Sequence, residues 1–184
     1  MANTTIGTPV GPFSIIARGS AVLSSGFTDD LDELISTIHP TLRDEHDADA
    51  DIDAIAAATR DYFDGDLTAI DTVKVDQRSG GQFLDHAWET LRQVPGGRPL
   101  TYKEFASRAG RPLAIRGAAQ ACARNTVALF VPCHRIVRTD GGLGGYRWGL
   151  DAKRWLLAYE QTAVRDAAAQ PSEARHEDPV TSDI

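Results

Sequence analysis

Cysteine is nearly absent from this chain, and so are long apolar stretches and runs of proline or glycine. The 184 residues include 2 Cys, 9 Pro and 16 Gly. So few prolines and glycines exclude a collagen-like or low-complexity chain, and 42% hydrophobic residues suit a globular core. With Cys122 and Cys133 alone there is no disulfide framework of the kind that small secreted domains use, so we expect reduced thiols.

Signals that direct a protein to a membrane are also missing. No apolar run reaches the roughly 18 residues of a membrane span, and the opening Met-Ala-Asn-Thr-Thr-Ile lacks the features of a signal peptide. We therefore expect a soluble, cytoplasmic protein with no membrane partner.

Positive charge is scarce overall but not evenly so. The formal net charge is -7, which by itself argues against a nucleic-acid partner. Residues 1 to 78 hold 5 Lys and Arg against 15 Asp and Glu, whereas residues 79 to 160 hold 12 against 6. The balance is thus -10 in the front half and +6 in the back half, so the back half alone could meet DNA.

The first 78 residues read as a small α/β domain. Two β-rich runs around Gly19-Ser20, within residues 12 to 27, predict a hairpin. Apolar residues at helical spacing predict helices over residues 29 to 38, with Asp29 or Asp30 as N-cap, and over residues 52 to 63. The acidic stretch between them, residues 43 to 53, is typical of a solvated loop. Val73 and Val75 predict a short strand.

After a polar, glycine-rich boundary at residues 77 to 81, three helices are predicted. They start at Gln82, at residue 102 behind a Thr101–Glu104 capping box, and at residue 112. The second and third, separated by Gly110-Arg111, form a helix-turn-helix candidate. The small residues of the third helix are explained equally well by tight packing inside a core.

A candidate nucleophile follows a buried run. The apolar residues 127 to 131 lead into Pro132, Cys133, His134 and Arg135. A thiol beside a base and a cation can be activated for nucleophilic attack, although an inert buried cysteine is the alternative for an isolated Cys-His pair. Downstream, five glycines within residues 141 to 149 surround Tyr146-Arg147-Trp148, which suggests a loop that closes on a flat ligand.

Together these motifs resemble the O6-alkylguanine-DNA alkyltransferases. The resemblance covers residues 82 to 160 without a gap, above all Val-Pro-Cys-His-Arg-Ile-Val at 131 to 137 and Gly-Tyr-Arg-Trp-Gly at 145 to 149. In that form the back half is most similar to the C-terminal domain of the bacterial adaptive-response protein. The front half matches more loosely, chiefly at residues 7 to 16. The regulatory domain of the adaptive-response protein is absent, so the chain resembles the stand-alone form.

The resemblance implies a single-turnover DNA repair protein, a methylated-DNA–protein-cysteine S-methyltransferase. Cys133 would accept the alkyl group from O6 of guanine, His134 would take the thiol proton through a water, and Glu160 would orient the histidine. Asn125 and Tyr102 complete the implied catalytic set. Activity on O4-alkylthymine stays open.

The resemblance also assigns binding roles. The guanine would be flipped out of a duplex that is bound through its minor groove, with Arg116 filling the gap. The implied DNA-binding residues are Arg116, Gly117, Ala118, Ala121, Arg124 and Arg135. The implied base pocket is Tyr102, Cys122, Ile136, Tyr146, Arg147 and Trp148. Trp148 stands where some relatives have glycine, and we expect it to narrow the pocket against bulky free bases.

The resulting expectation is a ribonuclease H-like α/β domain at residues 1–78, a mostly helical, winged helix-turn-helix active-site domain at 79–162, and a flexible tail at 163–184. We expect no cofactor, and no zinc because the front half offers only His39 and His46 as ligands of that kind. We expect a monomer, and clustering on DNA stays open. Three alternatives remain: a damage sensor without transfer, a cysteine hydrolase, and a winged-helix regulator.

Overall fold

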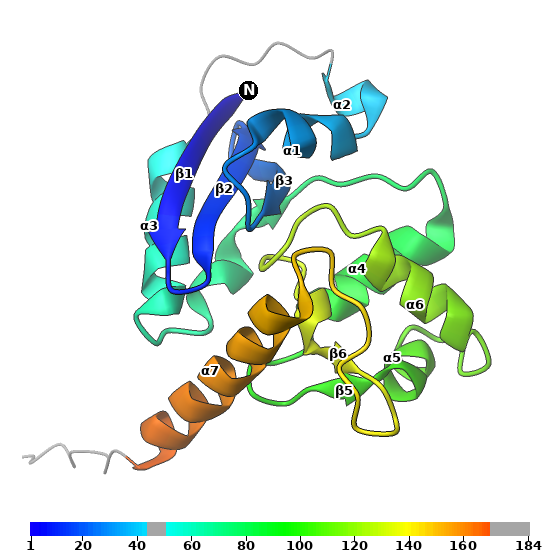
Figure 1. Cartoon of the computed structure of the whole chain (residues 1–184). Coiled ribbons are helices and arrows are strands. Elements are labelled where there is room, and N and C mark those ends of the chain that lie inside the picture. Colours follow the sequence, from blue (N-terminus) through cyan, green and yellow to red (C-terminus); the bar gives the residue numbers. More distant parts are fainter. Residues whose placement is uncertain (44–50, 170–184) are drawn as a thin grey trace, which may run out of the picture.

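The front half of the chain is built on a four-stranded sheet (Figure 1). The computed structural model describes residues 1–43 and 51–169. The strands β1 (Ala2–Thr8), β2 (Gly11–Arg18) and β3 (Ala21–Gly26) pair antiparallel, and β4 (Lys74–Val75) pairs parallel with β3. The predicted hairpin is therefore confirmed as β2 and β3. The sequence reading missed β1, an edge strand in which only Ile6 is buried, so it lacks the apolar alternation of a strand.

Helices cover this sheet where the sequence predicts them. Asp30 caps α1 (Leu31–Thr37) by accepting hydrogen bonds from the amides of residues 32 and 33, and Asp51 caps α3 (Ile52–Phe63). Pro40 ends the first helix as expected, but it also begins a one-turn helix, α2 (Pro40–Arg43). A short 3-10 helix, η1 (Ala69–Thr72), precedes β4. Most of the predicted acidic loop, residues 44–50, lies outside the described residues.

The back half is mostly helical. Its elements are α4 (Gln82–Arg92), β5 (Leu100–Thr101), α5 (Tyr102–Arg108), α6 (Ile115–Ala123), the 3-10 turn η2 (Cys133–Arg135), β6 (Ile136–Val137) and α7 (Leu150–Ala169). The capping box that opens α5 is confirmed. The helix predicted from residue 112 begins only at Ile115, where no side chain caps it. α7 continues through residues 163–169, which the sequence reading assigned to the tail, and the remaining tail lies outside the described residues.

The two halves share hydrogen bonds and a core. The amide of Ser25 in β3 donates to the carbonyl of Thr126, and the amide of Ala128 donates back to Ser25. The segment that leads to Cys133 is thus held as an extension of the front sheet. One core cluster also spans both halves, with the rings of Phe13 and Phe130 6.4 Å apart. The sheet therefore helps to position the residues that follow position 126.

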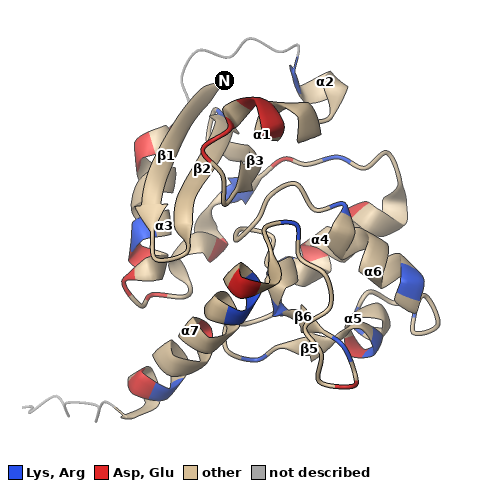
Figure 2. Cartoon of the chain, in the orientation of Figure 1, with Lys and Arg blue, Asp and Glu red and all other residues tan. Residues whose placement is uncertain are grey.

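The charge asymmetry of the sequence is kept in space. Helix α1 of the front half carries only acidic charges and α6 of the back half only a basic one, whereas α3 and α5 carry both (Figure 2). No helix within residues 1–43 and 51–169 has both the length and the hydropathy of a membrane span.

Candidate active site

Cys133 is the first residue of η2, a single turn of 3-10 helix in the back half. The apolar run before it is buried throughout, and Leu129 adopts a left-handed φ of 71° that turns the chain toward Pro132. After the turn, Ile136 pairs with Leu100 in the parallel β5–β6 ladder, which brings the start of α5 beside the cysteine segment. Cys133 itself is 8% exposed.

Asn125 ties this cysteine to the end of α6. Its Nδ2 lies 3.2 Å from Sγ of Cys133 and donates to the carbonyl of Val131 at 2.7 Å. Its Oδ1 accepts from the amide of Val127 at 3.0 Å. Both the nitrogen and the oxygen of the side-chain amide are therefore hydrogen-bonded, so Asn125 fixes the loop between α6 and the thiol.

Beside the thiol lies a buried histidine–carboxylate pair. Nε2 of His134 is 2.9 Å from Oε1 of Glu160 of α7, and both side chains are fully buried. Nδ1 of His134 is buried and has no protein partner among the described residues. The amide of Gly97 donates to Oε2 of Glu160 at 3.2 Å. The pair thus holds the ring by one nitrogen and leaves the other available for proton transfer.

The environment sets the charges of these groups. Burial raises the pKa of the Cys133 thiol, although the Asn125 hydrogen bond and the charges of Lys153 and Arg147 oppose this. Burial lowers the pKa of His134, against the attraction of Glu160. Burial opposes ionisation of Glu160 as well, but His134 and Arg135 hold its pKa below the usual range. The resting state is a thiol, a neutral imidazole and a carboxylate.

Arg135 is not a DNA-binding residue, which corrects the sequence expectation. Its side chain is 1% exposed. Its Nε donates to both carboxylate oxygens of Glu160 at 3.0 and 3.1 Å, and Nη2 donates to Oε1 at 2.8 Å. Nη1 donates to the carbonyl of Val94. The guanidinium is committed to the carboxylate inside the protein and cannot reach a phosphate.

Two tyrosines and Cys122 lie close enough to Cys133 for its charge to act on them. Burial, together with the Cys122 and Cys133 thiols in their charged form, raises the pKa of Tyr102 to about 12. Burial also raises the pKa of Tyr146, whose hydroxyl is buried without a protein partner and whose ring lies 6.5 Å from that of His134. Both phenols stay protonated at neutral pH and can donate hydrogen bonds. Ile136 is fully buried.

The glycine-rich loop forms the wall of a surface hollow. This hollow, of about 810 Å³, is lined by residues of that loop together with Arg138 and Tyr146. At Gly144, with φ 72°, a Cβ would lie 2.7 Å from the Tyr102 hydroxyl, so only glycine lets the loop approach the tyrosine. Arg147 is exposed on the same loop.

Trp148 packs against both core clusters, and its expected effect on the width of the base pocket stays a prediction. Its ring packs against Gly26 of β3, where a Cβ would come within 1.9 Å of Cζ2 of the indole. It also covers the small cluster of Ile16, Leu23, Leu34, Ile38 and Leu42 in the front half. The indole therefore anchors the glycine-rich loop to the sheet.

Helix α6 presents a mixed surface. Arg116 and Arg124 are exposed, as a DNA-contacting role requires. Ala118 and Ala121 are fully buried, and the Ala121 carbonyl accepts from the indole of Trp88, so these two residues pack the helix and do not face DNA. At Gly117 a Cβ would lie 2.8 Å from Cε1 of Phe83, so close helix packing explains this glycine too.

The small residues on the open side of α6 are others than those predicted. Ala119 and Ala123 are exposed there, together with the longer Gln120. A hollow of about 380 Å³ lies beside them, and its lining includes Tyr102, Arg116 and Ala119. This surface connects the helix to the tyrosine of the candidate base pocket.

Two residues of the site escaped the sequence reading. Tyr62 of α3 donates from Oη to Oε1 of Glu160 at 2.7 Å. Lys153 of α7 is fully buried, and its Nζ donates to the carbonyls of Ile136 at 2.6 Å and Gly145 at 3.3 Å. Lysine at an otherwise apolar helical position was the available signal for Lys153. Nothing local marks Tyr62, because its partner lies 98 residues away.

In the described part of the chain, no group of three or more His, Cys, Asp or Glu side chains could hold a metal ion. Both cysteines are free.

Comparison with known proteins places the site in a family context. Residues 82–162 match the family described as 6-O-methylguanine DNA methyltransferase, DNA binding domain. A methylated-DNA--protein-cysteine methyltransferase of Salmonella typhimurium is 31% identical over 84% of this chain and 92% of its own length. One of Mycobacterium bovis is 34% identical, over 86% of this chain and 91% of its own length.

Two further relatives show how far the similarity extends. The bifunctional transcriptional activator/DNA repair enzyme Ada of Escherichia coli is 45% identical over 48% of this chain, but the chain spans only 25% of that protein. The crystal structure of Mycobacterium tuberculosis OGT in complex with DNA aligns with a TM-score of 0.70 at 29% identity, covering 88% of this chain and 93% of that one.

Proposed function

Because this chain belongs to the O6-methylguanine-DNA methyltransferase family, we propose that it repairs DNA directly, by moving the alkyl group from O6 of an alkylated guanine to Sγ of Cys133. The observation that carries this role is the placement of the thiol. Sγ lies 3.2 Å from Nδ2 of Asn125, in the same 3-10 turn as His134, whose partner Glu160 is fully buried.

The transfer is a single displacement. The Cys133 sulfur attacks the alkyl carbon, a carbon–sulfur bond forms, and the bond from that carbon to O6 breaks with its electron pair leaving on guanine. The thiol proton passes through a water to Nδ1 of His134, the ring nitrogen without a protein partner. Glu160 stabilises the imidazolium that results. The thioether is stable, so each molecule acts once.

Two phenols would receive the base. Tyr102 and Tyr146 remain protonated because burial raises the pKa of each, so they can donate hydrogen bonds to a guanine that leaves as an anion. The backbone of the glycine-rich loop around Arg147 would complete the pocket. Burial and the charge of Cys133 also raise the pKa of Cys122, and we place this half-buried residue in the same pocket.

We propose that α6 enters the minor groove of duplex DNA. Small exposed residues, Ala119 and Ala123, let the helix backbone approach the narrow groove, and Arg116 projects to fill the gap left by the flipped guanine. Leu113 and Ile115, 96% and 43% exposed, flank Arg116 and would lie against the sugars. Flipping costs a few kcal/mol, which these contacts offset.

The finer fold assignments belong to the same proposal. We assign residues 1–78 to a ribonuclease H-like domain and residues 79–162 to a winged helix-turn-helix domain. We propose that the whole protein acts as a monomer in the cytoplasm. The alignment with the OGT–DNA complex over 88% of the chain supports one continuous DNA-bound arrangement of both.

Intact mass tests the function. The protein is incubated with duplex DNA bearing a single O6-methylguanine, and we expect a gain of one methyl group that maps to Cys133. Cys133→Ala should gain none, and Cys122→Ala should still gain it. Tight binding without an adduct would instead support a damage sensor, and cleavage of an ester substrate by unchanged protein would support a hydrolase. Sequence-dependent binding of undamaged DNA without an adduct would support a regulator.

A further inference from the structure

A tyrosine of the front half reaches the histidine–carboxylate pair of the back half. Tyr62 lies near the end of α3 and is fully buried. Its hydroxyl donates to Oε1 of Glu160 at 2.7 Å. This is the same oxygen that lies 2.9 Å from Nε2 of His134. The front half thus contacts the proton-transfer pair through one phenol, although it supplies neither the thiol nor the base.

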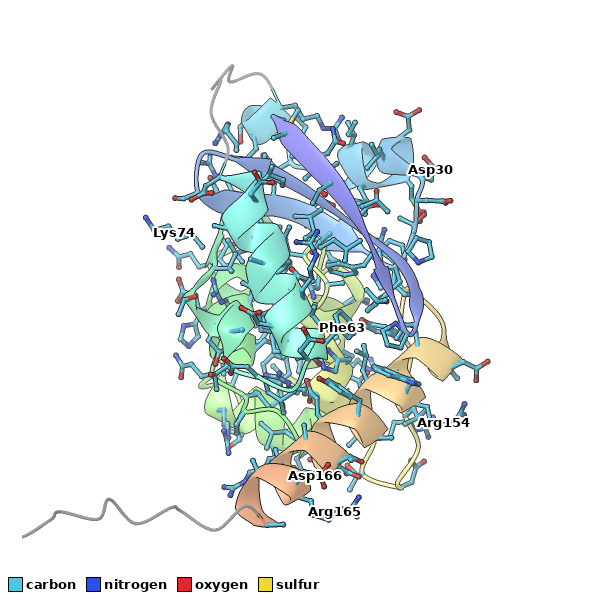
Figure 3. The ribbon with its side chains drawn as sticks, turned by 90° about the vertical axis from the view of Figure 1, so that its left-hand side faces the viewer. Asp30, Phe63, Lys74, Arg154, Arg165 and Asp166 are labelled. Atoms are coloured by element: carbon cyan, nitrogen blue, oxygen red, sulfur yellow. The ribbon has the colours of Figure 1, made fainter. Side chains whose placement is uncertain are left out.

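The phenol is held in place from two sides. The hydroxyl of Tyr159 of α7 donates to the backbone carbonyl of Tyr62, and the two rings meet edge to face with centroids 5.7 Å apart. The neighbouring Phe63 packs against Trp155 and Tyr159, both 6.2 Å away by ring centroid. Figure 3 shows Phe63 where α3 ends beside α7. A ring fixed in this way can place its hydroxyl on the carboxylate with little freedom to move.

We propose that Tyr62 is a positioning residue for alkyl transfer: its hydrogen bond fixes Oε1 of Glu160 and restrains the pull of that oxygen on the proton of His134. The proposal rests on the transfer function of Cys133. Because Oε1 receives donors from Tyr62 and Arg135 as well as from His134, its negative charge is shared among them. A fully unshared carboxylate would favour imidazolium in the resting protein, and an imidazolium cannot accept the thiol proton.

Other charged groups surround the pair and stay unchanged in the experiment that follows. Arg135 and Cys133 face it from η2, Lys153 from α7, Tyr146 from the glycine-rich loop and Asp71 from η1. Burial lowers the pKa of His134, and Glu160 opposes this effect. Loss of the Tyr62 hydroxyl leaves more charge on Oε1, so the pKa of His134 rises toward the range of an exposed histidine.

The test compares Tyr62→Phe with Thr59→Val. Each variant loses one fully buried hydroxyl from α3, but the Thr59 hydroxyl donates to the carbonyl of Ile55, whereas the Tyr62 hydroxyl donates to Glu160. The single-turnover rate of methyl transfer from an O6-methylguanine duplex is measured as a function of pH. For Tyr62→Phe we expect a rate lower by roughly tenfold, as for loss of a hydrogen bond to a charged group, with the acid limb of the profile at higher pH. Thr59→Val should keep the wild-type acid limb.

The outcomes are separable. If the wild-type chain transfers no methyl group, the proposed function fails before Tyr62 is tested. If it does, and Tyr62→Phe keeps the wild-type rate and pH profile, the positioning role is wrong. If both variants are slowed equally and the acid limb does not shift, Tyr62 contributes only to core packing, which also overturns the proposal. Titration with excess duplex gives the active fraction, so a partly unfolded variant is not mistaken for a slow one.

Discussion

The indole of Trp148 lies directly against the backbone of Gly26, so closely that a Cβ on Gly26 would sit 1.9 Å from Cζ2 of the ring. This contact joins the glycine-rich loop of the back half to strand β3 of the front half. Its tightness makes the loop position dependent on the absence of a side chain at residue 26.

Gly26→Ala is therefore expected to destabilise the protein. The new methyl must displace the indole, and overpacking of this kind costs about 1–3 kcal/mol. For a chain of this size that lowers the melting temperature by roughly 2–4 °C per kcal/mol. Gly7→Ala is the matched control, because Gly7 lies in β1 and has nothing within 4 Å of a Cβ. Equal melting temperatures for the two variants would contradict the close contact.

Replacing Arg135 should lower the stability of the protein, whereas replacing Arg116 should weaken its binding to DNA. Arg135→Ala removes a buried guanidinium from Glu160, and breaking a buried ion pair on one side costs about 3–5 kcal/mol. Arg116→Ala removes an exposed side chain and should leave the stability unchanged. Urea unfolding measures the first effect, and duplex binding at several salt concentrations measures the second. We expect Arg116→Ala to weaken binding; a loss of stability in Arg116→Ala with none in Arg135→Ala would reverse the assignment.

Lys153 should matter both for the fold and for the thiol. Lys153→Met keeps the aliphatic stem but leaves the carbonyls of Ile136 and Gly145 without a donor, at about 1–3 kcal/mol for an unsatisfied buried group. It also removes a positive charge that lowers the pKa of Cys133, so that pKa should rise further. Thiolate absorbance followed against pH measures the pKa, and urea unfolding measures the stability.

The control for this variant is Lys74→Met, which replaces an exposed lysine of β4. It should change neither quantity. A Lys153→Met protein whose thiolate titrates at lower pH than the wild type would show that the lysine does not act on the sulfur.

Acid should destabilise the protein in a way that depends on Glu160. The pKa of this carboxyl is held below its ordinary value of 4.5 by His134 and Arg135, against the effect of burial. A group with a lowered pKa in the folded state stabilises the protein above its unfolded-state pKa and loses that contribution as the pH falls. We expect the free energy of unfolding to decline below about pH 4.5, and less steeply in Glu160→Gln.

Glu89→Gln serves as the control for acid unfolding, because the Glu89 side chain is 77% exposed. Its curve of stability against pH should follow that of the wild type. If Glu160→Gln followed the wild type as well, the carboxyl would not carry the charge that the structure gives it.

Local patterns in the sequence predicted local structure well. The limits of α3 match the prediction at both ends because Asp51 caps its start and a glycine stands two residues beyond its end. The capping box of α5 likewise needs only Thr101 and Glu104. β1 was missed because an edge strand buries little and shows no alternation.

Contacts between residues far apart in the sequence were harder to predict. The placement of Cys133 beside Asn125 followed from the family resemblance, whereas Tyr62 could be linked to Glu160 only in three dimensions. Arg135 and Ala121 were expected on the DNA-binding surface, but both are buried. The residue type suggested a surface role, and the direction in which each side chain points decided otherwise.

The near-complete burial of Cys133 bears on how long the protein lasts. A molecule that reacts once is wasted if its thiol meets an oxidant or a soluble electrophile first. At 8% exposure, with a pKa raised by burial, the sulfur is mostly protonated and sheltered at neutral pH. The thiol therefore reacts mainly with a guanine that the DNA places in the pocket. The same burial that shapes the reaction also protects the unreacted protein in the cell.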